Sequence, residues 1–168
     1  GLVGNWKREM RTLFSLYFRE VTGPDCRDEN PFLGPGSDLV IVSVDTLSSD
    51  RPFGRLSATE TQPYDLVIFD EAHKLSAARN ADGTYDTTDR YKLAELLAGA
   101  DPLQETRSPR RLPWHAHHLL LLTATPHMGK DFPYYALWRL LEPSLLSSVD
   151  AFNNFTSEAR ALHFMRRD

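Results

Sequence analysis

Two adjacent carboxylates follow a short apolar run and are the side chains in this sequence best suited to chemistry. Residues 66–69 read Leu-Val-Ile-Phe, a pattern typical of a buried strand, and Asp70 and Glu71 come directly after it. In an open α/β sheet, ligands bind at the carboxyl ends of the strands. An aspartate there can order Mg²⁺ through its water ligands, and a neighbouring glutamate can polarise the water that attacks a γ-phosphate. Asp70 and Glu71 are therefore candidate catalytic and metal-linked residues; the alternative is a pair of solvated acids at a strand end.

Small hydroxyl side chains follow a second apolar run of the same kind. Residues 119–122 are four leucines, and Thr123, Ala124 and Thr125 come next. Because the carboxyl ends of parallel strands meet at one edge of a sheet, we expect these threonines to lie beside the two carboxylates. The alternative is that β-branched residues at the end of a strand have no function beyond their conformational preference.

A stretch with positive charge and no acid covers residues 107–118. Its three arginines, Arg107, Arg110 and Arg111, are candidate contacts to nucleic acid phosphates, and the alternative is a solvated loop punctuated by proline. Its three histidines share no metal-ligand spacing with a carboxylate or a cysteine, which favours loop histidines over a zinc site. Cys26 is the single cysteine, so an internal disulfide and a multi-thiolate metal site are both excluded.

Helices and strands alternate along the chain and must position these side chains. Apolar residues spaced by three and four predict helices, and short β-branched or leucine-rich runs predict strands. The predicted helices cover residues 5–17, 89–98, 132–141 and 150–166. The predicted strands cover residues 38–44, 64–69 and 118–122, and a loop rich in proline and glycine covers residues 23–37.

Local signals mark two of the predicted helices. Asn5 is predicted to cap the first helix, Thr88 or Asp89 to cap the second, and Gly99 to end it. The near-continuous apolar runs predict strands that are buried on both faces and joined by helical crossovers. The sequence therefore predicts an α/β fold with a parallel sheet.

Composition limits the class of protein further. The 168 residues fit one ordinary domain, and 41% hydrophobic and 25% charged residues are typical of a globular chain. The sequence contains no apolar run near the ~20 residues that a membrane span needs, so no membrane partner is expected. A net charge of −4 argues against a basic nucleic acid binder as a whole but leaves room for a local positive patch.

Two motifs together resemble a known family. Asp-Glu-Ala-His at residues 70–73 and Thr-Ala-Thr-Pro at residues 123–126 resemble the motif pair of helicase superfamily two, and the details are similar to its Swi/Snf-type ATPase branch. Further segments match in the same order along nearly the whole chain: residues 2–6 with Glu9, 42–47, 138–143 and 164–167. The long connection 75–118 and residues 127–132 resemble prokaryotic members of the family, of the transcription-recycling or phage-defence kind. A prokaryotic member would be cytoplasmic, and a eukaryotic one would be nuclear.

The resemblance implies a RecA-like three-layer sandwich that binds ATP and Mg²⁺ and moves along double-stranded DNA. It implies that Asp70 is the Mg²⁺-linked carboxylate and Glu71 the base that activates water. The residues implied to couple the nucleotide site to DNA binding are His73, Thr123, Ala124 and Thr125. Those implied to face the DNA backbone are Asn5, Ser43, Asp45 and Thr46. Local packing is the alternative for His73, and turn chemistry is the alternative for Ser43, Asp45 and Thr46.

One motif that the family requires is missing from these 168 residues. A G-x-x-x-x-G-K-[ST] loop holds the triphosphate in such enzymes, whereas Gly129-Lys130 here is followed by Asp131. We therefore expect residues 1–168 to be an N-terminally incomplete first RecA-like lobe, inactive alone, whose P-loop segment and second lobe belong to the same protein. The rival interpretations are a degenerate lobe that binds nucleic acid or protein without catalysis, and a nuclease or metal hydrolase that uses Asp70 and Glu71.

Overall fold

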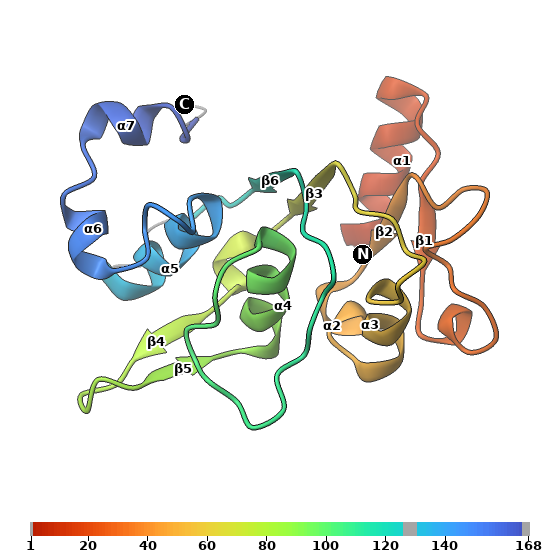
Figure 1. The fold of residues 1–168 in the computed structure, drawn as a ribbon. Coiled ribbons are helices and arrows are strands. Elements are labelled where there is room, and N and C mark those ends of the chain that lie inside the picture. The colour runs from red at the N-terminus through yellow and green to blue at the C-terminus, as the bar shows by residue number, and fades with distance from the viewer. Residues whose placement is uncertain (1, 126–130, 166–168) are drawn as a thin grey trace. The chain divides into compact units, whose positions relative to one another are not determined.

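The computed structural model describes residues 2–125 and 131–165 and divides the chain into two compact units, whose elements are labelled in Figure 1. The first unit comprises residues 1–64 and 110–114, and the second comprises residues 65–109 and 115–168. The assignment of residues 1–168 to one RecA-like lobe stays a prediction, and each unit is described by itself.

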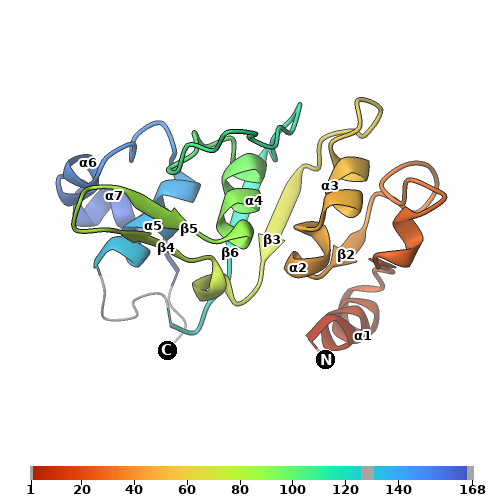
Figure 2. The ribbon, with the colours of Figure 1, turned by 90° about the horizontal axis from the view of Figure 1, so that it is seen from below.

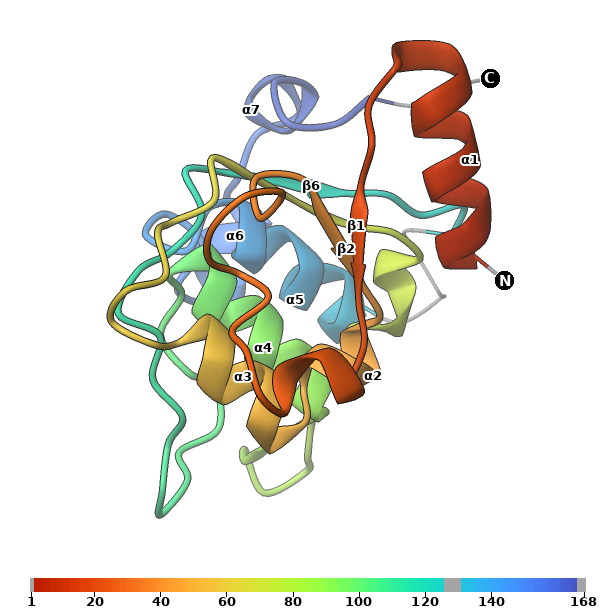
Figure 3. The same ribbon diagram turned by 90° about the vertical axis from the view of Figure 1, so that its right-hand side faces the viewer.

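A short parallel pair of strands lies in the first unit. Strands β1 (Arg19–Val21) and β2 (Val40–Val42) lie side by side, with Arg19 opposite Val40 (Figure 3). The helices of this unit are α1 (Leu2–Phe14), α2 (Val44–Leu47) and α3 (Asp50–Leu56), and the 3-10 turn η1 spans Pro24–Cys26. Its buried apolar side chains include Val21, Cys26, Phe53 and Leu56.

Helix α1 begins and ends about three residues earlier than predicted. Asn5 lies inside the helix, so its predicted role as N-cap is wrong. The reason is that Leu2 and Val3 continue the apolar face of Trp6 toward the N-terminus. The helix ends at Phe14 because the next residue, Ser15, adopts the left-handed backbone conformation with a φ of 56°.

The strand predicted over residues 38–44 is shorter in the structure. Ser43 follows β2 and caps α2, because its hydroxyl oxygen accepts a hydrogen bond from the Thr46 N–H at 3.0 Å. Val44 therefore begins a helix instead of ending a strand. Strand β1 was not predicted, because three residues are too few to reveal an alternating pattern.

The second unit contains a parallel and an antiparallel pair of strands. Strands β3 (Leu66–Phe69) and β6 (His118–Leu121) are parallel, with Leu66 opposite His118, so the predicted pairing of these two runs is confirmed. Strands β4 (Ala77–Arg79) and β5 (Tyr85–Thr87) form a hairpin that was not predicted and that packs against α5 (Figure 2). Gly83 in its turn has a φ of +86°, a conformation that favours glycine.

Capping residues determine where several helices of the second unit begin and end. Helix α4 (Asp89–Ala98) is capped by Thr88 and ends at Gly99, and α5 covers Asp131–Leu141, so both predicted helices are confirmed. The helix predicted over residues 150–166 is wrong, because two short helices occupy that range, α6 (Val149–Asn153) and α7 (Ser157–Ala161). Thr156 starts the second of them by accepting a hydrogen bond from the Ala159 N–H at 3.2 Å. The remaining element is the 3-10 turn η2 (Ala72–Lys74).

The structure is a mixed α/β fold that contains helices and two parallel pairs of strands among its described residues. Among the described residues, the strands form three separate pairs, so a continuous three-layer sandwich stays a proposal. The expected burial of the strands on both faces is wrong for β3 and β6, since Leu66, Ile68 and Leu120 are 41–49% exposed. No helix in the described ranges is long and apolar enough to cross a membrane.

Candidate functional site

The ends of β3 and β6 lie next to each other in the second unit. The Leu122 N–H donates to the Phe69 carbonyl at 2.8 Å, and the Ala72 N–H donates to the Leu122 carbonyl at 2.8 Å. These bonds continue the pairing of the two strands past the strand ends and enclose Asp70 and Glu71 between them. The backbone of residues 70 and 71 is therefore held next to the segment that leads into Thr123.

His73 connects the acid segment to the threonine segment. Its Nδ1 lies 3.2 Å from the Thr123 hydroxyl and 3.2 Å from the Glu71 carboxylate. The imidazole therefore lies within 3.2 Å of a carboxylate on one side and of a hydroxyl on the other. The Thr123 hydroxyl oxygen also accepts from the Thr125 N–H at 3.1 Å. The structure therefore brings Glu71, His73, Thr123 and Thr125 into one series of contacts, with Ala124 exposed between the threonines.

The backbone of Glu71 is left-handed, with a φ of 53° and a ψ of 43°. An L-residue in this conformation costs of order 1–3 kcal/mol, and such residues cluster at functional sites. The strain is local to the point where the chain leaves β3 and enters η2 (Ala72–Lys74). It turns the chain so that the Glu71 carboxylate contacts His73 two residues later.

Asp70 offers a hard oxygen ligand of the kind that Mg²⁺ prefers. Its carboxylate accepts a hydrogen bond from the Glu71 N–H at 2.8 Å, and the residue is half-buried. The described residues contain no group of three or more His, Cys, Asp or Glu side chains that could hold a metal ion by themselves. This arrangement fits a Mg²⁺ ion held by one or two carboxylates together with water and phosphate oxygens, and it does not fit a closed protein cage.

Two of the residues expected to face DNA in the first unit, Ser43 and Thr46, take part in helix capping. The Ser43 and Thr46 hydroxyls share a hydrogen bond of 2.7 Å at the start of α2, and Asp45 is exposed in the same turn. Asn5 is also exposed, and its side-chain oxygen accepts from the Arg8 guanidinium at 3.2 Å. The hydrogen bonds of Ser43 and Thr46 are those of a helix start, which is the alternative given for these residues. Contact of Asn5, Ser43, Asp45 and Thr46 with DNA stays a prediction.

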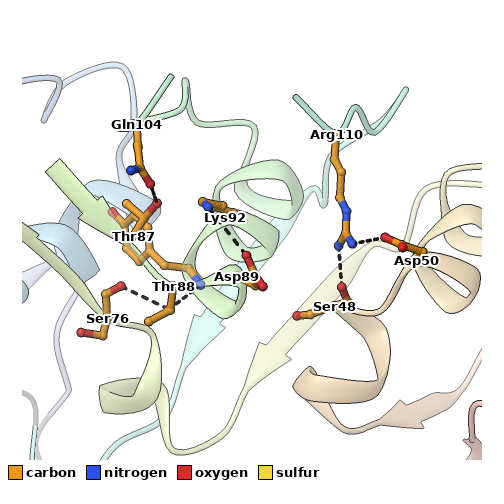
Figure 4. A network of polar contacts seen from close by, with 10 residues as sticks. Ser48, Asp50, Ser76, Thr87, Thr88, Asp89, Lys92, Gln104 and Arg110 are labelled. Carbon is orange, nitrogen blue, oxygen red and sulfur yellow. Dashed lines mark hydrogen bonds and ion pairs between the residues drawn. The ribbon is translucent and has the colours of Figure 1, made fainter. Parts of the chain in front are cut away.

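The three loop arginines do not share one environment. Arg107 is exposed in the second unit, and Arg110 and Arg111 belong to the first. Arg110 donates to the Asp50 carboxylate and to the Ser48 carbonyl, as Figure 4 shows, whereas Arg111 is exposed. Arg110 therefore has an internal structural role that its sequence context did not indicate.

A buried ion pair in the second unit was missed by the sequence analysis. The Arg139 guanidinium of α5 lies 3.0 Å from the Glu95 carboxylate of α4, and both residues are at most 5% exposed. Burial raises the pKa of the Glu95 carboxyl, whereas the hydrogen bond from the Leu103 N–H and the charge of Arg139 lower it. The spacing of residues could have indicated that Glu95 is buried, because it follows the buried Tyr91 by four residues and lies on the same face of the helix.

Some residues of the predicted motifs lie outside the described ranges. They are Pro126 of the second motif, residues 127–130 of the segment 127–132 with its Gly129-Lys130 pair, and residues 166–167 of the final match. Asp131 begins α5.

Comparison with known proteins finds relatives along most of the chain. RNA polymerase-associated protein RapA of Actinobacillus succinogenes is 32% identical over 156 residues, which cover 88% of this chain and 14% of that protein. RapA of Photobacterium profundum is 28% identical over 88% of this chain and 13% of its own length. The Bacillus subtilis protein named uncharacterized ATP-dependent helicase YqhH is 27% identical over 90% of this chain and 21% of its own length. No family model matches the sequence.

These relatives support the resemblance to helicase superfamily two in its general form. Similarity extends over 88–90% of the chain, so it is not confined to the two short motifs. The chain spans only 13–21% of the length of these relatives. The activity, substrates and partners of a whole protein are therefore matters for proposal.

Proposed function

We propose that this chain is part of the first ATP-binding lobe of a nucleic-acid-dependent ATPase, a Swi/Snf-type DNA translocase of helicase superfamily two. The observation that carries the proposal is the contact of His73 with both Glu71 and Thr123, where β3 and β6 end together. Similarity to a protein named as an ATP-dependent helicase supports the same conclusion. The RecA-like sandwich, the P-loop segment and the second lobe belong to this proposal as parts of the same protein.

In this proposal the two carboxylates have separate roles. Asp70 would hold Mg²⁺ through water ligands, and the bound ion would supply positive charge to offset that of the transferring phosphoryl group. Glu71 accepts a proton from the attacking water, for which its carboxylate must be ionised and correctly placed. The left-handed backbone and the His73 contact fix the placement of that carboxylate.

His73 and residues 123–125 are proposed to couple hydrolysis to nucleic acid binding. The imidazole is in contact with the base on one side and with the Thr123 hydroxyl on the other. A displacement of the 123–125 segment on nucleic acid binding would therefore move the Glu71 carboxylate. Coupling of this kind requires no large rearrangement, because a change of about 1 Å in the position of a catalytic group alters rates strongly.

Double-stranded DNA is the proposed nucleic acid, bound through its phosphates. Contacts to the DNA backbone suit a motor that moves over any sequence, since they position a protein without reading bases. The net charge of −4 requires that such contacts be confined to a small part of the surface.

The test is ATP hydrolysis by the natural full-length protein with and without duplex DNA. We expect duplex DNA to stimulate hydrolysis, and His73→Ala to reduce the stimulation because the link between Glu71 and Thr123 is lost. His117→Ala is the matched control, since His117 is an exposed histidine of the same unit. Absence of stimulation in the unmodified protein would contradict the proposed function, and an equal effect of both variants would contradict the role of His73.

A further inference from the structure

Residues 110–114, which we name the clasp segment, are fastened within the first unit at both of their ends. They belong to the connection between α4 and β6, which is otherwise part of the second unit. Arg110 makes the contacts at one end and Trp114 at the other. A loop of charged residues and prolines, typical of a solvated linker, is thus held at two defined points.

The Arg110 guanidinium uses three distinct features of its chemistry. One terminal nitrogen donates to the Ser48 carbonyl, and the other donates to the Asp50 carboxylate (Figure 4). The face of the group lies over the Phe53 ring, with Cζ 5.1 Å from the ring centroid. Only a planar fork with several donors can make all three contacts together, so a lysine at this position cannot replace it.

Trp114 fastens the other end of the clasp segment through an aromatic contact. Its ring lies 5.9 Å from that of Tyr64, with an angle of 57° between the planes. The Tyr64 hydroxyl donates to the Ser37 carbonyl at 2.8 Å, and burial raises the pKa of this hydroxyl to about 12. Tyr64 is therefore a neutral, anchored partner for Trp114 throughout the physiological pH range.

The charge of Arg110 is already matched, whereas Arg111 between the two anchors is exposed. We propose that Arg110 is a positioning residue that fastens the clasp segment to the α2–α3 region, and that Arg111 is the cation this segment offers to a nucleic acid phosphate. The second half rests on the proposed function. The first half, the anchoring role of Arg110, is independent of it.

Anchoring is tested by amide hydrogen exchange in the natural full-length protein without nucleic acid. We expect Arg110→Ala and Arg110→Lys to speed exchange over the clasp segment to a similar extent, because both remove the fork. Arg111→Ala, the matched control one residue away, should leave exchange unchanged. Exchange that is unaffected by Arg110→Ala, or restored by Arg110→Lys, would overturn the anchoring role.

The phosphate contact is tested by the salt dependence of binding to two unrelated duplexes. We expect Arg111→Ala to weaken both complexes equally and to reduce the slope of log affinity against log salt by about 0.9. Arg110→Lys keeps the positive charge but loses the anchor, so it should weaken binding as Arg110→Ala does. If Arg110 were itself the phosphate ligand, Arg110→Lys would retain most of the affinity and the slope, and this result would overturn the proposal.

Variants of Asp50, which pairs with Arg110, give a second test of whether Arg110 anchors the clasp segment or binds phosphate itself. Asp50→Asn loosens the anchor, whereas Asp28→Asn removes the same charge from another exposed acid of the first unit and serves as its control. We expect binding to be weaker in Asp50→Asn than in Asp28→Asn. Tighter binding in Asp50→Asn would show that Asp50 merely competes with phosphate for Arg110.

The two sets of measurements separate the two hypotheses. If exchange follows the expected pattern but no duplex binds even to the unmodified protein, the proposed function fails and the anchoring role stands. If duplex DNA binds and stimulates hydrolysis but Arg111→Ala leaves the salt slope unchanged, the phosphate contact of the clasp segment is wrong and the proposed function stands.

Discussion

At the scale of single residues, Glu71 combines a strained backbone with a carboxylate held by His73. A side chain held in this way is an unusual arrangement for a solvated acid at a strand end, where rotation would be free. The proposed catalytic role of Glu71 therefore rests on its backbone and its contact with His73 as well as on the sequence motif. It also means that tests of Glu71 must preserve its size and backbone preference.

Glu71→Gln in the natural full-length protein is expected to reduce ATP hydrolysis by about 10²–10⁴, the usual contribution of a general base. The amide keeps the size of the side chain but cannot accept the proton, so nucleotide affinity should change little. Single-turnover hydrolysis and equilibrium nucleotide binding measure the two effects separately, with Glu105→Gln, an exposed acid of the same unit, as control. A loss of affinity as large as the loss of turnover would contradict the assignment.

Asp70→Asn is expected to behave differently, because its proposed partner is the ion. The amide is a weaker Mg²⁺ ligand than the carboxylate, so the Mg²⁺ concentration for half-maximal hydrolysis should rise along with a fall in rate. Hydrolysis titrated with Mg²⁺ at fixed ATP gives the comparison. An unchanged Mg²⁺ requirement would separate Asp70 from the metal.

At the scale of elements, the buried pair Glu95–Arg139 joins α4 to α5 and also binds the loop that follows α4. The Arg139 guanidinium donates to the Asp101 carbonyl, and the Leu103 N–H donates to the Glu95 carboxylate. Arg139→Met is expected to destabilise the protein by about 3–5 kcal/mol, because it leaves Glu95 buried without its counter-ion. Urea unfolding measures the loss.

The double variant Glu95→Leu with Arg139→Met is the control for this pair. Replacing both charges by apolar side chains removes the uncompensated charge, so much of the stability should return. If the double variant were as unstable as the single one, the loss would come from packing and not from the ion pair.

The contact between the residues that follow α7 and α5, His163 and Glu142, is expected to depend on pH. Its Nδ1 lies 3.0 Å from the Ala159 carbonyl and its Nε2 lies 2.6 Å from the Glu142 carboxylate. Both partners only accept, so the ring must carry two hydrogens to satisfy them. The hydrogen bond to the Ala159 carbonyl raises the pKa of His163 in the folded state, and the Glu142 carboxylate raises it further.

Because this pKa is higher in the folded than in the unfolded state, the stabilisation is complete below about pH 6.5 and is lost as the pH rises through the folded value. The ring centroids of Trp138 and His163 lie 6.5 Å apart, so the fluorescence of Trp138 reports the protonation of His163. In a Trp6→Phe, Trp114→Phe background, we expect Trp138 fluorescence to titrate with pH while His163 is present and to stay flat when His163→Gln is added. Among the described residues, Arg160 of α7 and Glu142 are charged groups of the same region, and a titration that persists in His163→Gln would assign the effect elsewhere.

The elements that could be predicted from the sequence are those whose ends are marked by capping residues or glycine. Helix α4 was predicted to the residue because Thr88 caps it and Gly99 adopts the left-handed conformation that ends it. The helix over 150–166 failed because the cap at Thr156 lies inside an unbroken apolar spacing. Burial of the strands could not be predicted, since apolar runs do not say what covers each face.

The candidate site divides in the same way. The adjacency of the segments after β3 and β6 follows from strand order and was predicted from the two runs. The resemblance implied that His73 and Thr123 act together, whereas the contact of His73 with Glu71, the left-handed backbone of Glu71 and the internal contacts of Arg110 are visible only in three dimensions. No local pattern encodes them.

At the scale of the whole molecule, the missing G-x-x-x-x-G-K-[ST] motif leads to a simple expectation. A polypeptide of these 168 residues alone should hydrolyse ATP negligibly, because it contains no such loop to hold the triphosphate. Phosphate release with and without duplex DNA checks this. Turnover near 1 s⁻¹, at the low end of ordinary enzyme rates, would contradict it.

The chain passes between the two units three times, after residues 64, 109 and 114. Neither unit is therefore a continuous stretch of sequence, and no single cut of the gene separates them. When a ribosome has added residue 64, the first unit still lacks residues 110–114, which are made only after α4. The first unit can therefore reach its final form only after α4 has been made, and a truncation before residue 110 would leave Phe53 and Tyr64 without the side chains that lie over them.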